Sequence, residues 1–388
     1  MQLKGLISLS FGTLSLGITE FVAMGLLPYI AADFSISLAS AGHFVSAYAL
    51  GVAAGAFSLL FLRRLKLKTI LLLLIIVHIV GNALTVAATS FPALITARFI
   101  AGLPHGCYFG VGSIIAQRLC EKGKGSSAVS IMVAGMTMAN IFGVPLGTAL
   151  AEIVSFKAIY VLTVIWGVIV LFSCHRWVQD VGRIEDTGFK GQFKFLRSPA
   201  PWLVLGATLF GNAGIFCMQS YISPILTDLA GFKLQTVPAV LIAMGICMVI
   251  SNFISGRLCD RFSPGKVGAG VQFTAIILLL AIAACGHMPW VCVILVCLTA
   301  GALFALSSPE QVSILRTSPG GLLLGAAMIQ AAFNLGNALG TTSGGIPFIF
   351  SISPRFITVI GSLWALLGFI CLFLYARKWE KHFSDEIR

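Results

Sequence analysis

The sequence predicts an all-α integral membrane protein whose twelve transmembrane helices form two pseudo-symmetric six-helix bundles. Of its 388 residues, 58% are hydrophobic and only 10% are charged, whereas a soluble domain carries about 25% charged residues. The apolar residues also form blocks of about 20, the length at which a helix crosses the bilayer core. An internal repeat, with a constant offset between the two halves of the chain, is the third observation.

Six apolar blocks in the first half each predict one membrane helix. The first block is longer than the apolar region of a signal peptide, so we expect it to remain as a helix. Pro92 suits the first turn of the fourth helix, where its missing N–H costs nothing. The predicted ranges are 5–31, 42–62, 69–89, 92–116, 127–150 and 156–177.

A polar, charged stretch from Gln179 to Ser198 separates these blocks from six more. We expect a first bundle over residues 1–178, a cytoplasmic linker over 179–199 and a second bundle over 200–388. The predicted helices of the second bundle cover 201–226, 236–256, 267–286, 289–310, 320–345 and 355–377.

The two halves resemble each other at an offset of about 197 residues. ANIFGVPLG in the first half and GNALGTTSG in the second share the spacing N-x-x-G-x-x-x-G, and the GLLPYI and SYISPIL segments repeat at nearly the same offset. Parallel repeats of this kind are typical of alternating-access transporters, whose substrate site lies between the halves. The residues matched by the first pair are Asn140, Gly143 and Gly147 with Asn337, Gly340 and Gly344.

Basic residues indicate how the helices are oriented. If the N-terminus is cytoplasmic, 21 of the 25 Lys and Arg residues fall on the cytoplasmic side, and three fall outside. The remaining one, Arg98, lies within a predicted span. Cytoplasmic loops of membrane proteins are enriched in Lys and Arg, so this bias predicts that both termini are cytoplasmic. It also explains the net charge of +12 without a nucleic-acid partner.

Several other functional classes lack support in the sequence. The ten cysteines contain no C-x-x-C pair, and most lie in apolar blocks, which favours small buried residues over disulfides or a metal site. No Walker loop, H-E-x-x-H motif or pair of carboxylates within one helix is present. We therefore expect no enzyme activity, no cofactor and no ATP-driven pump.

Four stretches resemble the signatures of one transporter family. They are TEFVAMGLLPYIAADFSIS in the first helix, RFIAGLPHG in the fourth, AGMTMANIFGVPLGT in the fifth and SGRLCDRFSPGK after the eighth. On these motifs the whole chain resembles the major facilitator superfamily (MFS), and most of all its bacterial drug and sugar efflux proton-antiporter group, which includes arabinose and purine-nucleoside efflux permeases. The motif positions are Gly135, Asn140, Gly143, Pro145, Gly147, Gly256, Asp260 and Arg261.

The chain departs from the family pattern in two places. The first-half copy of the loop motif, LLFLRRLKLK, has neither the glycine nor the aspartate, and Val144 separates Gly143 from Pro145. The resemblance still implies the MFS fold with a central cavity, a small-molecule substrate and coupling to protons. For the glycine-rich fifth helix, tight packing and a seam that flexes during transport both remain open.

The first predicted helix carries an isolated carboxylate. Glu20 is the only charged residue between Lys4 and Asp33, and a charge at that depth must face protein or water because lipid exposure is costly. Two interpretations remain open: Glu20 binds and releases the coupling proton, or it is a structural acid held by permanent hydrogen bonds. Arg98 is the one intramembrane base, and it shares a helical face with His105. His105 is either a second proton carrier or a hydrogen-bonded core residue.

Polar side chains also form stripes at helical spacing on the seventh and eleventh predicted helices. Interhelical hydrogen bonding explains such stripes as well as a substrate site does. Because the family fold places the seventh helix beside the cavity, we expect the cavity to be lined by Asn212, Phe216, Gln219, Gln330, Asn334 and Asn337. Glu310, at the end of the tenth helix, is expected to have an interfacial role.

The sequence thus favours a monomeric, multi-pass transporter of the bacterial inner membrane. The expected activity is proton-coupled antiport, the efflux of a small polar or amphipathic molecule such as a sugar, nucleoside or drug. An importer with the same fold and a non-transporting membrane sensor are the alternatives.

Overall fold

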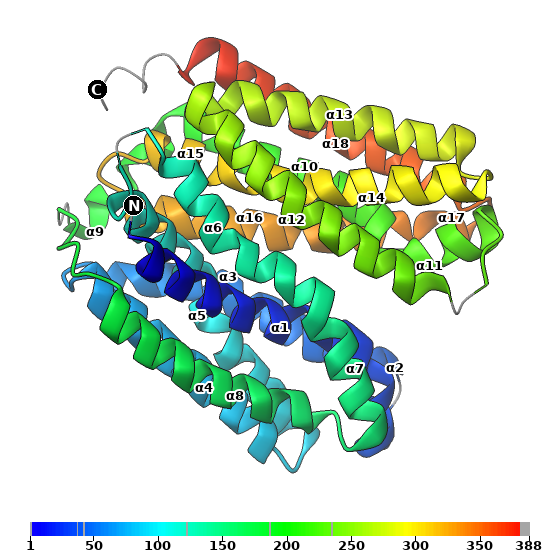
Figure 1. Cartoon of the computed structure of the whole chain (residues 1–388), viewed down its shortest axis with the longest axis horizontal. Coiled ribbons are helices and arrows are strands. Elements are labelled where there is room, and N and C mark those ends of the chain that lie inside the picture. The colour runs from blue at the N-terminus through cyan, green and yellow to red at the C-terminus, as the bar shows by residue number, and fades with distance from the viewer. Residues whose placement is uncertain are drawn as a thin grey trace. The chain divides into compact units, whose positions relative to one another are not determined.

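The computed structural model describes residues 2–36, 38–41, 43–121, 123–185, 188–233 and 236–380. Every regular element within these residues is a helix (Figure 1), which confirms the all-α fold class. Helices are the expected solution, since each satisfies its own backbone hydrogen bonds in a bilayer. Three of the basic residues used to orient the chain, Lys122, Lys381 and Arg388, lie outside the described residues.

Eleven helices among the described residues are long and apolar enough to cross a membrane. The predicted span 42–62 corresponds to α3, His43–Leu62, which has 20 residues. The apolar part of α3 that is described without a gap, His43–Leu59, is slightly too short to be counted with the other eleven. The predicted helices therefore all correspond to apolar helices of the structure.

By their contacts, the residues divide into two compact units. The first comprises Met1–Lys194 with Gly320–Ala331, and the second comprises Phe195–Pro319 with Ala332–Arg388. The helix α16, Leu322–Gly344, therefore contributes its first part to one unit and its second part to the other.

The first unit contains the blue-to-green helices of Figure 1. Within it α3 packs against α5, α4 against both α5 and α8, and α1 against α6 and α8. The elements are α1 (Leu3–Asp33), α2 (Leu38–Ala41), α3 (His43–Leu62), α4 (Leu67–Ala87), α5 (Phe91–Arg118), α6 (Gly125–Met138), the π-helix η1 (Ala139–Gly143), α7 (Val144–Ile153), α8 (Lys157–Trp177) and α9 (Gly188–Gly191).

Glycines allow α3 and α5 to approach closely. A Cβ atom added at Gly51 would meet the carbonyl group of Phe99, and one at Gly55 would meet that of Leu103. Conversely, a Cβ atom at Gly102 of α5 would meet the carbonyl oxygen of Tyr48 on α3. Small residues at such a seam let two backbones touch, which is how membrane helices associate without a hydrophobic driving force.

In the second unit α18 packs against both α10 and α13, and α12 packs against α14. The elements are the 3-10 helix η2 (Lys194–Arg197), which begins at the boundary, α10 (Pro199–Ser220), α11 (Ile222–Pro224), the π-helix η3 (Ile225–Leu229), α12 (Val237–Arg261), α13 (Pro264–Cys285), α14 (Pro289–Ala305), α15 (Ser307–Thr317), the second part of α16, α17 (Ile346–Ile349) and α18 (Arg355–Lys378).

Three predicted helices are interrupted in the structure. The tenth breaks at Leu306, between α14 and α15. The fifth contains the π-helix η1 between α6 and α7, and the seventh ends as α10 at Ser220 before continuing as α11 and η3. Proline explains part of this pattern, because Pro145 and Pro224 each remove one backbone donor at these breaks. Single π-helical turns of this kind occur frequently at functional sites.

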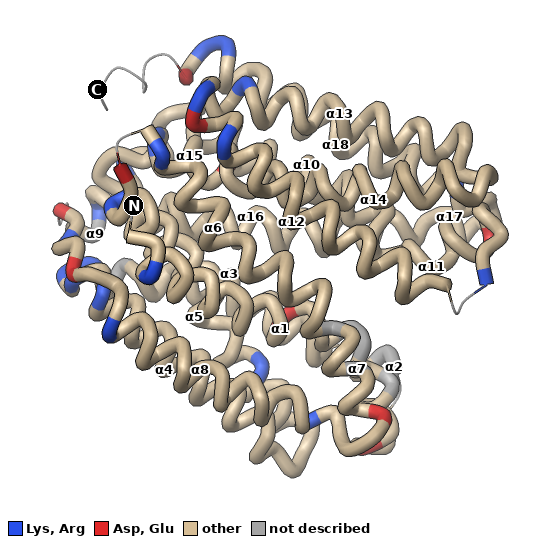
Figure 2. The backbone as a smooth tube through the Cα atoms, viewed as in Figure 1, with Lys and Arg blue, Asp and Glu red and all other residues tan. Residues whose placement is uncertain are grey.

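Basic residues gather mostly at one end of the helices within each unit (Figure 2). At that end of the first unit, Lys66 Nζ lies 2.5 Å from Asp180 Oδ2, and Arg118 donates to the carbonyl oxygens of Val181 and Arg183. The hydrogen bond from Lys66, followed by one from the Gly182 N–H, lowers the pKa of Asp180. The beginning of the predicted linker is thus attached to the first unit.

Candidate functional site

Glu20 lies inside the first unit, on α1, with only 7% of its surface exposed. Its Oε2 atom is 3.6 Å from Nε2 of His105 on α5, and it has no hydrogen-bond partner among the described residues. A buried carboxylate oxygen without a donor is rare and costly when it is ionised. The structure thus brings together two of the three predicted proton-coupling residues.

His105 is fully buried and contacts three polar groups. Its Nδ1 lies 2.8 Å from the Tyr48 hydroxyl, and its Nε2 lies 3.1 Å from Nε2 of Gln330. The ring also stacks on Phe109 with a centroid separation of 5.3 Å. The imidazole tautomer decides which partner donates at each ring nitrogen: with the proton on Nδ1, the Gln330 amide donates to Nε2 and the ring donates to Tyr48. At 3.6 Å from Nε2, the Oε2 atom of Glu20 makes no hydrogen bond with the ring.

Arg98, also on α5, is completely buried among aromatic rings. Its guanidinium carbon lies 4.3 Å from the ring centroid of Phe44, 4.4 Å from that of Tyr48 and 5.6 Å from that of Tyr160. Desolvated cation–π contacts of this kind are worth about 2 kcal/mol. The ring faces therefore supply much of the environment that stabilises a charge at this depth.

The Arg98 side chain also reaches α1. Its Nη2 donates to the carbonyl oxygen of Thr19 at 3.1 Å, and its Nε donates to that of Phe44 at 3.4 Å. No ion pair joins Arg98 to Glu20 among the described residues, although the Arg98 charge acts on the Glu20 carboxyl group. The guanidinium is thus anchored next to the carboxylate by backbone oxygens rather than by the carboxylate itself.

A second buried polar group, on α1 and α4, was not predicted. Nε2 of His78 lies 2.9 Å from the Ser15 hydroxyl, and Asn82 donates to the His78 carbonyl oxygen. Thr19 donates in turn to the Asn82 side chain at 3.3 Å, which links this group to the Arg98 anchor. His78 and Asn82 are four residues apart in an apolar helix, and this spacing is the signal that could have revealed them.

The glycines of the fifth-helix motif all face α1. A Cβ atom at Gly135 would meet backbone atoms of Ser10 and Leu14, one at Gly143 would meet Ile18, and one at Gly147 would meet Val22. Of the other two motif residues, Asn140 donates to the Met136 carbonyl oxygen within its own segment, and Pro145 is exposed near the start of α7. The seam therefore runs along the helix that carries Glu20.

The predicted cavity residues divide between the units. Gln330 belongs to the first unit, where it contacts His105, and the other five lie in the second unit on α10 and α16. There, Cβ atoms at Gly336 and Gly340 would meet Asn212 and Phe216, so the two helices are in close contact. Phe216 also packs edge-on against Phe333 at 5.9 Å.

Two of these amides have unused acceptors. Asn212 is buried and donates to the Thr208 carbonyl oxygen at 2.7 Å. In contrast, Oε1 of Gln219 and Oδ1 of Asn337 are buried without a hydrogen-bond partner among the described residues. Both of these side chains are partly exposed as a whole, as is Asn334. Each of these two side chains therefore keeps one unused acceptor.

The expectation that Glu310 has an interfacial role is wrong. Its side chain on α15 is only 3% exposed and lies close to those of Thr208 and Gln272. The amide of Gln272 lies against Gly211, where a Cβ atom would displace it. Glu310 is buried because α15 continues the apolar helix α14 and packs against α10 and α13. The second unit thus has its own buried carboxyl group.

The loop-motif residues lie in the last turns of α12. This helix ends at Arg261, five residues beyond the predicted boundary at 256, so Asp260 is helical rather than part of a loop. Gly256 is buried, Asp260 is half-buried and Arg261 is exposed. The structure places all three at one end of the second unit.

Comparisons with known proteins agree with this architecture. The profile of the Major Facilitator Superfamily matches residues 9–322. AraJ of Escherichia coli (strain K12) is 38% identical over 98% of this chain and 97% of its own. The inner membrane transport protein YdhP of the same organism is 32% identical over 96% of each chain.

A solved structure shows the same fold. The fucose:proton symporter FucP of E. coli aligns with a TM-score of 0.75 over 96% of this chain and 98% of its own, at 16% identity. The multi-pass helical fold with charged and polar groups buried inside it is that of a membrane transporter. The chain belongs to the Major Facilitator Superfamily. It is therefore a transporter of small molecules rather than an enzyme, and the predicted family is confirmed.

Proposed function

We propose that this transporter exports a small polar or amphipathic molecule in exchange for protons. The observation that carries the proposal is the buried Glu20 carboxyl group, whose Oε2 lies 3.6 Å from an imidazole nitrogen without receiving a hydrogen bond. Intramembrane acids often mark proton relays. A buried carboxyl group can hold a proton in one state and lose it when water reaches it.

The unused acceptors of the second unit indicate the class of substrate. Gln219 and Asn337 each have a buried carbonyl oxygen without a donor, and the buried ring of Phe216 lies one turn from Gln219 on α10. Such groups suit a molecule that carries hydroxyl or N–H donors on a partly apolar framework, such as a sugar, a nucleoside or an uncharged drug.

Alternating access requires the two six-helix bundles, residues 1–178 and 200–388, to move as bodies joined by the linker 179–199. The glycine seam of Gly135, Gly143 and Gly147 supports this assignment, because it packs α1 closely against α6 and α7 and so lets the first bundle move as one body. We assign Asp260 and Arg261 a role in stabilising one of the two states, as the family motif implies.

Reconstituted protein tests the proposal directly. A thermal-stability screen of sugars, nucleosides and antibiotics would first identify a ligand, which is then loaded into proteoliposomes. For an antiporter, acidifying the outside should accelerate efflux of the ligand and acidify the lumen at the same time. Movement of ligand and protons in the same direction would establish a symporter instead. A stabilising ligand that is never transported would favour a sensor.

We further propose that the protein is a monomer of the bacterial inner membrane with both termini in the cytoplasm. The distribution of basic residues predicts this orientation. A reporter fused after Arg388 should therefore score as cytoplasmic, and one fused to a chain truncated after Gly231, between α10 and α12, should score as extracytoplasmic. The reverse pair of results would show that the orientation is inverted, and two equal results would contradict the proposed number of spans.

A further inference from the structure

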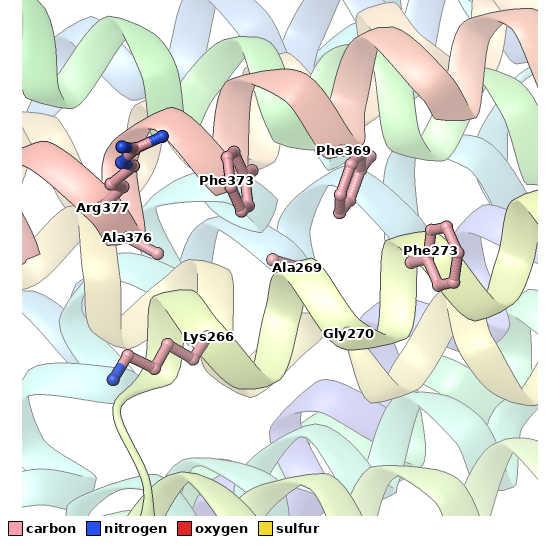
Figure 3. Close-up of a pocket in the computed structure, with 8 residues that line it drawn as sticks. All are labelled: Lys266, Ala269, Gly270, Phe273, Phe369, Phe373, Ala376 and Arg377. Atoms are coloured by element: carbon pink, nitrogen blue, oxygen red, sulfur yellow. The ribbon is translucent and has the colours of Figure 1, made fainter.

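A hollow on the surface of the second unit lies between α13 and α18. It has a volume of about 610 Å³, and Figure 3 shows the side chains that line it. They are Lys266, Ala269, Gly270, Phe273, Phe369, Phe373, Ala376 and Arg377. None of these residues belongs to the transport sites proposed above.

Small residues create the hollow, and phenylalanines form its walls. A Cβ atom at Gly270 would meet nothing within 4 Å, and Ala269 and Ala376 add little volume. The ring centroids of Phe273 and Phe369 are 5.6 Å apart, and those of Phe369 and Phe373 are 5.7 Å apart. Phe273 and Phe373 are 52% and 45% exposed, so the hollow opens sideways to the surroundings of the helices.

Two basic side chains mark one end of the hollow (Figure 3). Lys266 lies in the first turn of α13 and Arg377 in the last turn of α18, and both are exposed. Phe373 is one turn from Arg377, and Phe273 is two turns from Lys266, which is about 6 and 10 Å along the helix axes. Basic and aromatic residues therefore follow one another from the helix ends toward the middle of the span.

An acid is present at the same end but is directed elsewhere. The Glu380 side chain is buried, and its Oε1 accepts a hydrogen bond from the Gly265 N–H at 2.7 Å. It thereby satisfies a free backbone donor at the start of α13. No ion pair involves Lys266 or Arg377 among the described residues, so both charges are available to a ligand.

We propose that this hollow binds a phospholipid with an anionic headgroup. The phosphate lies between Lys266 and Arg377, and one acyl chain lies along the three phenylalanines. A phospholipid matches this arrangement, because its anionic group lies at the membrane surface and its hydrocarbon lies deeper. The basic residues and the phenylalanines of the hollow follow one another in the same order. Basic hollows between membrane helices are suited to such headgroups.

The test uses full-length protein, purified and delipidated in detergent. Thermal unfolding and native mass spectrometry are followed while phosphatidylglycerol or phosphatidylcholine with the same acyl chains is added. Phosphatidylglycerol should bind more tightly and raise the unfolding temperature more. Lys266→Gln and Arg377→Gln should each weaken its binding about fivefold, the effect of one basic residue near a charged lipid surface.

Two further variants separate binding from folding. Gly270→Leu places a side chain in open space and should leave the lipid-free unfolding temperature unchanged or higher, yet abolish the response to phosphatidylglycerol. Arg176→Gln, which removes an exposed charge at the end of α8 in the first unit, should respond as the wild-type protein does.

Equal responses to both lipids would overturn the proposal, as would a wild-type response in Gly270→Leu. If Arg176→Gln weakens phosphatidylglycerol binding as much as Lys266→Gln and Arg377→Gln do, the protein attracts anionic lipid in general and has no specific site. If the response appears only after removal of residues 381–388, the C-terminal segment occupies the hollow. A lipid-independent dimer that Gly270→Leu dissociates would instead assign the hollow to a second copy of the chain.

Discussion

Replacement of Glu20 by Gln should abolish transport driven by a pH gradient and leave substrate binding intact. Glutamine has nearly the same shape as a protonated glutamate, so the packing around Oε2 and His105 is retained. It cannot exchange a proton, however, and the coupled cycle cannot proceed. Uptake or efflux against a substrate gradient in proteoliposomes should fall to the level of empty liposomes, while ligand-induced thermal stabilisation should equal that of the wild-type protein.

The matched control is Glu152→Gln on α7. Glu152 is exposed, and it contacts none of the groups around Glu20, so this variant should transport normally. If Glu20→Gln still concentrates substrate when a pH gradient is applied, Glu20 is not the coupling residue. His105 and the buried Glu310 would then be the titratable groups to replace next.

The replacement of Gly135 by Ala should strongly destabilise the folded protein. A Cβ atom at this position would overlap the Ser10 carbonyl oxygen and lie 2.8 Å from the Leu14 backbone nitrogen. Backbone atoms of a packed helix cannot rotate away as a side chain can, so α1 and α6 must separate. Overpacking typically costs about 1–3 kcal/mol, and more when backbones must move. The unfolding temperature in detergent should fall, together with the yield of monodisperse protein.

Gly125→Ala, at the start of the same helix, provides the comparison. Its added Cβ atom would meet only the flexible Gln117 side chain at an ordinary 3.4 Å, so we expect no loss of stability. Equal unfolding temperatures for the Gly125 and Gly135 variants would mean that α1 and α6 are not held in this close contact in the protein.

Most of the fold could be predicted because a bilayer leaves few choices. A block of about 20 apolar residues must become a helix, and α18 accordingly covers Arg355–Lys378 where 355–377 was predicted. Boundaries outside the apolar region were harder to predict. The α12 helix continues to Arg261 because polar residues at a membrane surface can remain helical, and hydropathy does not detect them.

The polar groups were predicted one by one, but their partners were not. Helical spacing placed Arg98 and His105 on one face of α5. Nothing in the sequence, however, shows that the Tyr48 hydroxyl forms a hydrogen bond with the imidazole ring. That contact depends on the glycine seam between α3 and α5, which is a tertiary feature. Glu310 was misjudged for a similar reason, since its burial comes from the packing of α15 against two other helices.

The permanent charge of Arg98 limits the net charge that the buried groups of the first unit can have. A guanidinium is always protonated in proteins, and its enclosure by three aromatic rings keeps it in place. With His105 neutral, an ionised Glu20 brings the sum of the buried charges to zero, and a protonated one brings it to plus one. The pair of Arg98 and Glu20 is thus never net negative in either protonation state of the carboxyl group.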